Sequence, residues 1–294
     1  MKRIEKRAKR EEKRAKRRDA RPRRMSRQAL SEFIVKKRSI VPNIITMSNM
    51  TMGFFAIIFA SRGDGRSLAL AGMMVFFGSL FDAIDGAVAR AMHVESPVGV
   101  QLDSLADGIA YGIAPAVIAY QAYLSKPPFA TALFDFGILV ALVYPICAIY
   151  RLARFNIGAA EDDHTRFTGL PSPAAGILIA SMPMLEVPDF LSALKLTISF
   201  PWQVFIPIYV TVSLLMVSHI DYSKVFPLLM KKGKTVIVLS LILVILGVGL
   251  FSAWSVFIVM SIYVVAGVCI CLYRLAKRKG SHNRATNRPT RCDE

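Results

Sequence analysis

The 294-residue sequence has few cysteines, few histidines and few acidic residues relative to basic ones. Its four cysteines form neither a CxxC pair nor an extracellular disulfide pattern, and its four histidines lie singly, without the spacing of metal ligands. No cleavable signal peptide is evident before the first long apolar segment. These absences argue against a cysteine- or histidine-based metal site and against a secreted, disulfide-linked domain.

The excess of basic residues is confined to the two ends of the chain. Residues 1–40 carry 18 basic and 5 acidic residues, and residues 274–294 carry 7 and 2, whereas residues 41–273 carry 12 and 13. A basic tail directly before a first hydrophobic span is more typical of a topology determinant that contacts anionic lipid than of a nucleic-acid-binding segment. We therefore expect two basic cytoplasmic tails and no nucleic-acid partner.

Long apolar segments dominate the rest of the chain, and 54% of all residues are hydrophobic. Each segment is near the ~20 residues that cross ~30 Å as a helix, except a shorter fifth one. They span residues 41–60, 67–90, 100–123, 132–156, 172–186, 202–218, 234–252 and 255–273. The alternating pattern of a β-barrel is absent. The sequence thus predicts an all-α, polytopic membrane bundle of about eight transmembrane helices.

Basic residues are also unevenly distributed between the two sets of connections. Eight lie in or beside the connections on the side of the N-terminus, and four lie in the opposite connections. Cytoplasmic connections carry the excess of Lys and Arg in membrane proteins. The distribution predicts that both termini are cytoplasmic.

Four aspartates lie in FDAIDGAVARAMHVESPVGVQLDSLADG, residues 81–108, at the junction of the second and third predicted spans. Asp82 and Asp85 are three residues apart, and Asp103 and Asp107 are four apart, so each pair shares one face of a helix. The short connection between the spans brings the two faces together. We expect four carboxylates to converge near the cytoplasmic interface.

Carboxylates in a bilayer require compensation. One aspartate at mid-bilayer costs roughly 2.5–3.5 kcal/mol. Arg90 offsets one charge, and divalent cations are the natural partners of the others, with all-oxygen ligands favouring Mg²⁺ or Mn²⁺ over Zn²⁺. Gly86 leaves room for a ligand, while Arg90 and Ser96 can bind phosphate oxygens. The stretch therefore predicts a two-metal site for a pyrophosphate.

The spacing DxxDGxxAR, eight residues, then GxxxDxxxD resembles the signature of the CDP-alcohol phosphatidyltransferase family. The matching positions are Asp82, Asp85, Gly86, Ala89, Arg90, Gly99, Asp103 and Asp107. The resemblance implies an integral membrane enzyme, usually dimeric, that uses two divalent metal ions to displace CMP from a CDP-linked lipid by an alcohol hydroxyl.

Carried over by position, the resemblance assigns the four carboxylates to metal binding and the last of them also to proton transfer. The implied metal ligands are Asp82, Asp85, Asp103 and Asp107, with Asp107 as general base. The implied contacts to the CDP headgroup are Gly86, Arg90 and Ser96. Three polar residues of the first span, Asn43, Thr46 and Asn49, are further candidates for closing the site over the cytidine.

Four other stretches resemble the phosphatidylserine synthase subfamily. They are VPNIIT (41–46), YRLARFNI (150–157), FTGLPSPAAG (167–176) and LLMVSHIDYSK (214–224). The resemblance covers about residues 40–225, which gives a membrane domain at 41–225 and an additional hairpin at 226–273. It implies CDP-diacylglycerol as donor, L-serine as acceptor and a cytoplasmic membrane enzyme whose active site faces the cytoplasm.

The acceptor is less directly indicated by the residues themselves. Arg151 and Arg154 suit an amino-acid carboxylate, and with Asn156 they are the candidate serine ligands, but two guanidinium groups would equally suit glycerol phosphate. Phosphatidylglycerophosphate synthase is therefore an alternative. A transporter would also keep intramembrane acids, although the second half of the chain holds no second copy of the acidic cluster.

Overall fold

The computed structural model describes residues 40–92, 97–126, 128–129, 135–160, 169–187, 197–218, 220, 253–269 and 271. Regular secondary structure within these ranges is helical, and they contain no β-strand segment. Four helices there are long and apolar enough to cross a membrane: Pro42–Ala60, Gly65–Val88, Val98–Leu124 and Phe136–Ile157. These helices confirm the expected all-α architecture and the expectation of several helices that could span a membrane.

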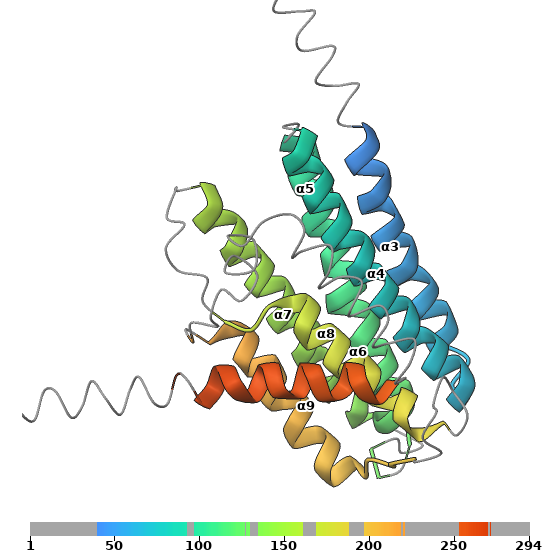
Figure 1. The fold of residues 1–294 in the computed structure, drawn as a ribbon. Helices are drawn as coiled ribbons and strands as arrows, with labels where there is room; N and C mark the ends of the chain where they lie inside the picture. Colours follow the sequence, from blue (N-terminus) through green and yellow to red (C-terminus); the bar gives the residue numbers. More distant parts are fainter. Residues whose placement is uncertain are drawn as a thin grey trace, which may run out of the picture.

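The first two helices form an antiparallel hairpin, and the third packs beside it (Figure 1). They are α3 (Ile40–Ala60), α4 (Gly65–Met92) and α5 (Pro97–Asp107). Gly63 adopts a φ of 73° in the turn between α3 and α4, which glycine tolerates without strain. Asp64 then accepts a hydrogen bond from the Ser67 backbone N–H at 2.9 Å and caps α4.

The third span continues beyond α5 through two π-helical turns. Asp107 is followed by a π-helical turn at Gly108–Ile113, by α6 (Ala114–Ala119) and by a second π-helical turn at Tyr120–Leu124. π-helical turns inside α-helices are frequent at functional sites because they shift the register of the side chains that follow. Here the first turn begins directly after the last aspartate of the motif.

The second half of the bundle is built around aromatic side chains. Its elements are α7 (Phe136–Ala160), α8 (Ser172–Ser181), a 3₁₀ turn (Pro183–Glu186), α9 (Trp202–Val217) and the helix Ala253–Cys269, red in Figure 1. Tyr123 stacks on Phe205 with ring centroids 4.0 Å apart, and Tyr144 stacks on Tyr209 at 5.5 Å. These rings tie the third span, α7 and α9 together.

The fifth predicted span, residues 172–186, is short, as its length in the sequence indicates. It forms α8, a helix of 10 residues, followed by the 3₁₀ turn. At 1.5 Å per residue α8 is about 15 Å long, half of the ~30 Å hydrocarbon core. Every residue of α8 except Pro173 is buried, so its apolar sequence reflects burial inside the protein.

Other parts of the prediction fall outside the described residues. They are the predicted span 234–252, the basic tail 274–294 and, except for residue 40, the basic tail 1–40. The predicted segments 202–218 and 255–273 correspond to the shorter apolar helices Trp202–Val217 and Ala253–Cys269. The count of eight spans and the orientation of the termini therefore stay predictions.

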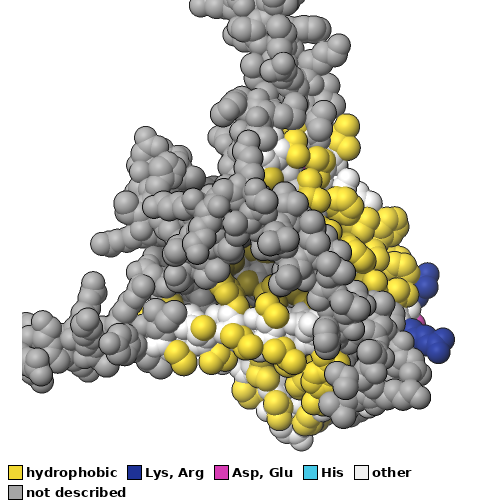
Figure 2. All heavy atoms as spheres, viewed as in Figure 1, with side chains coloured by type: hydrophobic (Ala, Val, Ile, Leu, Met, Phe, Trp, Pro, Cys, Tyr) yellow, Lys and Arg dark blue, Asp and Glu magenta, His cyan; other side chains and the backbone are white. Residues whose placement is uncertain are grey.

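The outer surface is largely hydrophobic where it is described. Figure 2 shows hydrophobic side chains spread over the outside of the bundle, with Lys and Arg gathered at one edge. On α3, Ile44, Phe54 and Phe55 are exposed. Exposed apolar side chains of this kind suit lipid tails rather than water.

Candidate active site

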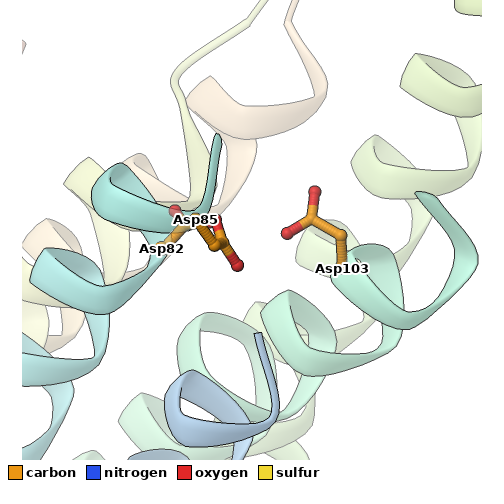
Figure 3. A group of neighbouring side chains, drawn as sticks. All are labelled: Asp82, Asp85 and Asp103. Atoms are coloured by element: carbon orange, nitrogen blue, oxygen red, sulfur yellow. The ribbon is translucent and has the colours of Figure 1, made fainter. Parts of the chain in front are cut away.

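Three aspartates of the motif come together between α4 and α5. Asp82, Asp85 and Asp103 each offer a carboxylate oxygen, and these oxygens all lie within 4.8 Å of one another. Figure 3 shows the two α4 carboxylates and the α5 carboxylate turned toward a common space. Oxygen atoms in such a group are the ligands that hard divalent cations prefer. The residues present therefore fit a divalent metal ion.

Helix α3 supplies polar contacts to both pairs of aspartates. The Thr46 hydroxyl donates a hydrogen bond to Asp85 Oδ2 at 2.6 Å, and Asn49 Nδ2 donates one to Asp107 Oδ1 at 3.3 Å. Thr46, Asn49 and Asp85 are all buried. Because these side chains lie on one face of α3, this helix orients a carboxylate from α4 and one from the end of α5.

Close helix packing makes these contacts possible. A Cβ atom on Gly78 of α4 would lie 2.8 Å from Asn49 Oδ1, and one on Gly53 of α3 would lie 2.7 Å from the Cα atom of Ala110. Both separations are shorter than a real Cβ contact allows. The two glycines thus let α3 approach α4 and the π-helical turn closely enough for its polar side chains to reach the aspartates.

Asp107 lies at the edge of the three-carboxylate group rather than within it. It interacts electrostatically with the other three aspartates, most strongly with Asp82, and also with Arg151 of α7. Asp107 therefore interacts both with the carboxylates of α4 and α5 and with Arg151 of α7.

Two arginines of α7 contact different elements. Arg151 Nη1 donates a hydrogen bond to the Ser172 hydroxyl, at the start of α8, at 2.7 Å. Arg154 donates from Nη1 to the Val217 carbonyl at 3.0 Å and from Nη2 to the Ser218 carbonyl at 3.3 Å. The Arg154 guanidinium therefore caps the C-terminus of α9, where unsatisfied carbonyls and the helix dipole favour a cation.

The segment before α8 docks on the same end of α9. The Gly169 N–H donates to the Ile220 carbonyl at 2.9 Å, and the Leu170 N–H donates to the Leu215 carbonyl at 3.0 Å. Gly169 has a φ of 93°, and a Cβ atom there would clash with the Met216 carbonyl oxygen. A glycine is therefore required where this segment crosses α9.

Asn156 pairs with a serine of the motif helix. Its Nδ2 donates to the Ser104 hydroxyl at 2.9 Å, and this hydroxyl lies 3.1 Å from Asn156 Oδ1. Ser104 follows Asp103 directly in α5. The pair ties the C-terminal part of α7 to the helix that carries the second pair of aspartates.

The remaining predicted site residues are placed less fully. Gly86 in α4 and Asn43 in α3 are half-buried. The Arg90 side chain and all of Ser96 lie outside the described residues. Sequence reasoning missed Ser104, Tyr111, Tyr144 and Ser172. Tyr111 lies one helical turn after Asp107, a spacing that could have identified it, and it interacts electrostatically with all four aspartates.

Comparisons with known proteins agree on one family. The family model for CDP-alcohol phosphatidyltransferase matches residues 39–214. A CDP-diacylglycerol–serine O-phosphatidyltransferase of Helicobacter pylori is 33% identical over 242 residues, which cover 80% of this chain and 92% of that protein. An archaetidylserine synthase of Methanothermobacter thermautotrophicus is 31% identical over 207 residues, 68% of this chain and 75% of that protein.

A mycobacterial relative is longer than the matched region. The CDP-diacylglycerol–serine O-phosphatidyltransferase of Mycobacterium leprae is 34% identical over 196 residues, which cover 63% of this chain. The match spans 58% of that relative's own length.

Proposed function

The chain belongs to the CDP-alcohol phosphatidyltransferase family, and from that premise we propose that it transfers a phosphatidyl group from CDP-diacylglycerol to the hydroxyl of L-serine. The products are phosphatidylserine and CMP. The observation that carries the proposal is the convergence of Asp82, Asp85 and Asp103 within 4.8 Å inside an apolar bundle. The names of the relatives support serine as the acceptor.

Two divalent ions, Mg²⁺ or Mn²⁺, are the proposed cofactors. Asp82, Asp85 and Asp103 would hold them, with Asp107 as an additional ligand at the edge of the cluster. When bound, such ions neutralise a pyrophosphate and stabilise the charge that develops on the departing phosphate. Four carboxylates without cations would repel one another and would be costly to keep in a membrane.

The transfer is an in-line displacement with Asp107 as the general base. The bond between the serine hydroxyl oxygen and the lipid-linked phosphorus forms as the bond from this phosphorus to the bridging oxygen breaks. CMP leaves with the electron pair, and Asp107 takes the hydroxyl proton. The hydrogen bond from Asn49 would orient the Asp107 carboxylate for this step.

The donor headgroup occupies the α4 side of the cluster in this proposal. Gly86 leaves space beside Asp85, while Arg90 and Ser96 bind the phosphates. Asn43, at the beginning of α3, would contact the cytidine. Thr46 and Asn49 donate to the aspartates, so we assign them to positioning the carboxylates rather than to binding the nucleotide.

The acceptor occupies the α7 side. Arg151 interacts electrostatically with Asp107, which supports its role as the serine carboxylate ligand. The donors of Arg154 are directed at the end of α9, and Asn156 is paired with Ser104. We therefore propose that Arg154 and Asn156 position α7 around the acceptor instead of contacting it.

The enzyme would function in the cytoplasmic membrane with its active site at the cytoplasmic face. That placement follows from the concentration of basic residues in the two tails and in the connections on their side. The tails would contact anionic lipids. A homodimer is the expected assembly, as the family resemblance implies.

The direct test measures CMP release by purified protein in lipid nanodiscs that contain CDP-diacylglycerol and Mn²⁺. L-Serine, glycerol 3-phosphate and inositol are added one at a time. Release with serine alone is expected, with phosphatidylserine as the lipid product. Release with glycerol 3-phosphate alone would favour phosphatidylglycerophosphate synthesis, and absence of release with every alcohol would contradict the transferase assignment.

A further inference from the structure

Among the described residues, two buried polar groups on one face of α7 have no hydrogen-bond partner. Within the described part of the chain, neither the Tyr144 hydroxyl nor Arg151 Nε makes a hydrogen bond. Tyr144 is fully buried. The two residues are seven apart in α7, which places them on the same face two turns from each other, and they interact electrostatically.

Two neighbouring buried tyrosines have partners for their hydroxyls, whereas among the described residues the Tyr111 hydroxyl, near the aspartates, is unpaired like that of Tyr144. Tyr209, which stacks on Tyr144, donates to the Ala141 carbonyl at 2.7 Å, and Tyr123 donates to Glu186 at 3.0 Å. A buried hydroxyl without a partner costs about 1–3 kcal/mol. A phenylalanine at position 144 would fill the same volume without this cost, so a tyrosine there implies a ligand for its hydroxyl.

The face of α7 that carries the unpaired groups packs against the segment that follows the proposed general base. Ala148 lies between Tyr144 and Arg151 on the same face of α7, and its side chain packs against Gly112 of the π-helical turn that follows Asp107. Arg151 in turn interacts electrostatically with Asp107. A molecule bound to Tyr144 and Arg151 would thus lie beside the group that accepts the hydroxyl proton.

A third group reaches this location from outside the matched family region. Tyr263 belongs to the helix Ala253–Cys269, whereas the family model ends at residue 214. Tyr263 is half-buried, packs against the aromatic core and interacts electrostatically with Arg151. The C-terminal helix therefore adds a hydroxyl to the surroundings of the arginine.

We propose that Tyr144, Arg151 and Tyr263 form a subsite for the carboxylate of the amino-acid acceptor, so that a helix outside the matched family region contributes to acceptor specificity. The cluster supplies one guanidinium and neutral hydroxyls, which match a monoanionic carboxylate. A phosphate dianion would favour a second cation, and both Nη groups of Arg154, the other arginine of α7, already donate to carbonyls at the end of α9. This inference rests on the proposed function and names its acceptor subsite.

The test compares steady-state constants for serine and for CDP-diacylglycerol in full-length variants. Tyr144→Phe should raise the KM for serine about tenfold, Arg151→Lys about 100-fold and Tyr263→Phe severalfold, because each loses a hydrogen bond to a charged ligand. The KM for CDP-diacylglycerol should stay within twofold of wild type. Tyr150→Phe is the matched control: Tyr150 precedes Arg151 but is exposed, and this variant should match wild type.

Two further readouts separate binding from structural effects. Wild type should prefer L-serine to L-serinamide, which lacks the carboxylate, and this preference should fall at least fivefold in Tyr144→Phe and Tyr263→Phe. The thermal stability of Tyr144→Phe without substrate should equal or exceed that of wild type, since the lost hydroxyl has no partner in the described residues.

The outcomes distinguish the subsite from the function on which it rests. An active wild type with an unchanged serine KM and unchanged discrimination in Tyr144→Phe and Tyr263→Phe would overturn the subsite alone. A destabilised Tyr144→Phe with normal serine binding would do the same and would indicate a structural hydroxyl. A wild type without serine-dependent CMP release would overturn the proposed function and the subsite together.

Discussion

The carboxylate side and the arginine side of the candidate site are built differently. The carboxylates come from two helices that follow each other directly in sequence, α4 and α5, and they are oriented by the neighbouring α3. The arginines of α7 contact α8 and α9, and Arg151 also interacts with the helix Ala253–Cys269. The first side depends on helical periodicity, and the second on tertiary packing between distant segments.

This difference predicts how variants fail. Changes to the carboxylates should abolish chemistry while the fold persists, because the bundle is held by apolar packing and the acidic cluster adds repulsion to it. Changes on the arginine side should divide into effects on acceptor binding and effects on stability. The following predictions test that division, from the largest expected effect to the smallest.

Replacement of a clustered carboxylate should have the largest effect. Asp85→Asn removes one of the three carboxylates and weakens the acceptor for the Thr46 hydroxyl, so turnover should fall by about 10³-fold, the scale of a lost electrostatic stabiliser. Serine-dependent CMP release measures it. Asp64→Asn, an exposed aspartate before the same helix, is the control and should retain turnover. Equal losses in both variants would contradict a specific role for the cluster.

Replacement of the proposed base should separate binding from chemistry. Asp107→Asn keeps a side chain of the same size beside Asn49, so CDP-diacylglycerol should still bind, whereas turnover should fall about 10²-fold. Nucleotide-lipid binding is measured by stabilisation against heating, and turnover by CMP release. Retention of near-normal turnover would exclude Asp107 as the base.

Crowding between α3 and α4 should have an intermediate effect. A methyl group in Gly78→Ala would overlap with Asn49 Oδ1, so Asn49 should shift away from Asp107 and the kcat should fall roughly tenfold, with a stability loss of about 1–3 kcal/mol. Gly65→Ala at the start of the same helix is the control, because its Cβ would lie 3.5 Å from Val187, an ordinary contact. An unchanged kcat in Gly78→Ala would argue against the positioning role of Asn49.

Loss of the α9 cap should affect stability more than chemistry. Arg154→Ala removes two hydrogen bonds to the carbonyls of Val217 and Ser218 and should lower the free energy of unfolding by about 1–3 kcal/mol. The serine KM should change less than threefold at temperatures where the variant is folded. Thermal unfolding in detergent measures the loss of stability. Arg66→Ala, which replaces an exposed arginine, is the control. A large rise in serine KM without a stability loss would restore Arg154 as an acceptor ligand.

The carboxylate cluster was predictable because its information is local. Spacings of three and four residues, with a short connection between two spans, predict that four carboxylates converge, and Asp82, Asp85 and Asp103 do so while Asp107 lies outside this group. The polar residues Thr46 and Asn49 of the first span are predicted to close the site over the cytidine, whereas in the structure both contact the aspartates. The pairing of Thr46 with Asp85 and of Asn49 with Asp107 depends on how closely the helices pack. Local sequence spacing does not predict that packing.

The arginine side was less predictable for the same physical reason. Val217 lies 63 residues from Arg154, so no local pattern distinguishes a helix cap from a substrate ligand. Tyr144 in an apolar span resembles an ordinary core residue, and what distinguishes it is that its hydroxyl has no partner among the described residues. Hydropathy likewise cannot distinguish the protein-buried α8 from a helix in lipid, because both environments select apolar residues.

The most direct test of the central claim is phosphatidylserine formation by protein stripped of metal with EDTA. The assay contains CDP-diacylglycerol and L-serine, and Mn²⁺ or Mg²⁺ is then added back to wild type and to Asp103→Asn. We expect no product before metal is added, full recovery in wild type and little recovery in Asp103→Asn. Undiminished phosphatidylserine formation in EDTA, or full recovery in Asp103→Asn, would contradict a metal-dependent transfer at these carboxylates.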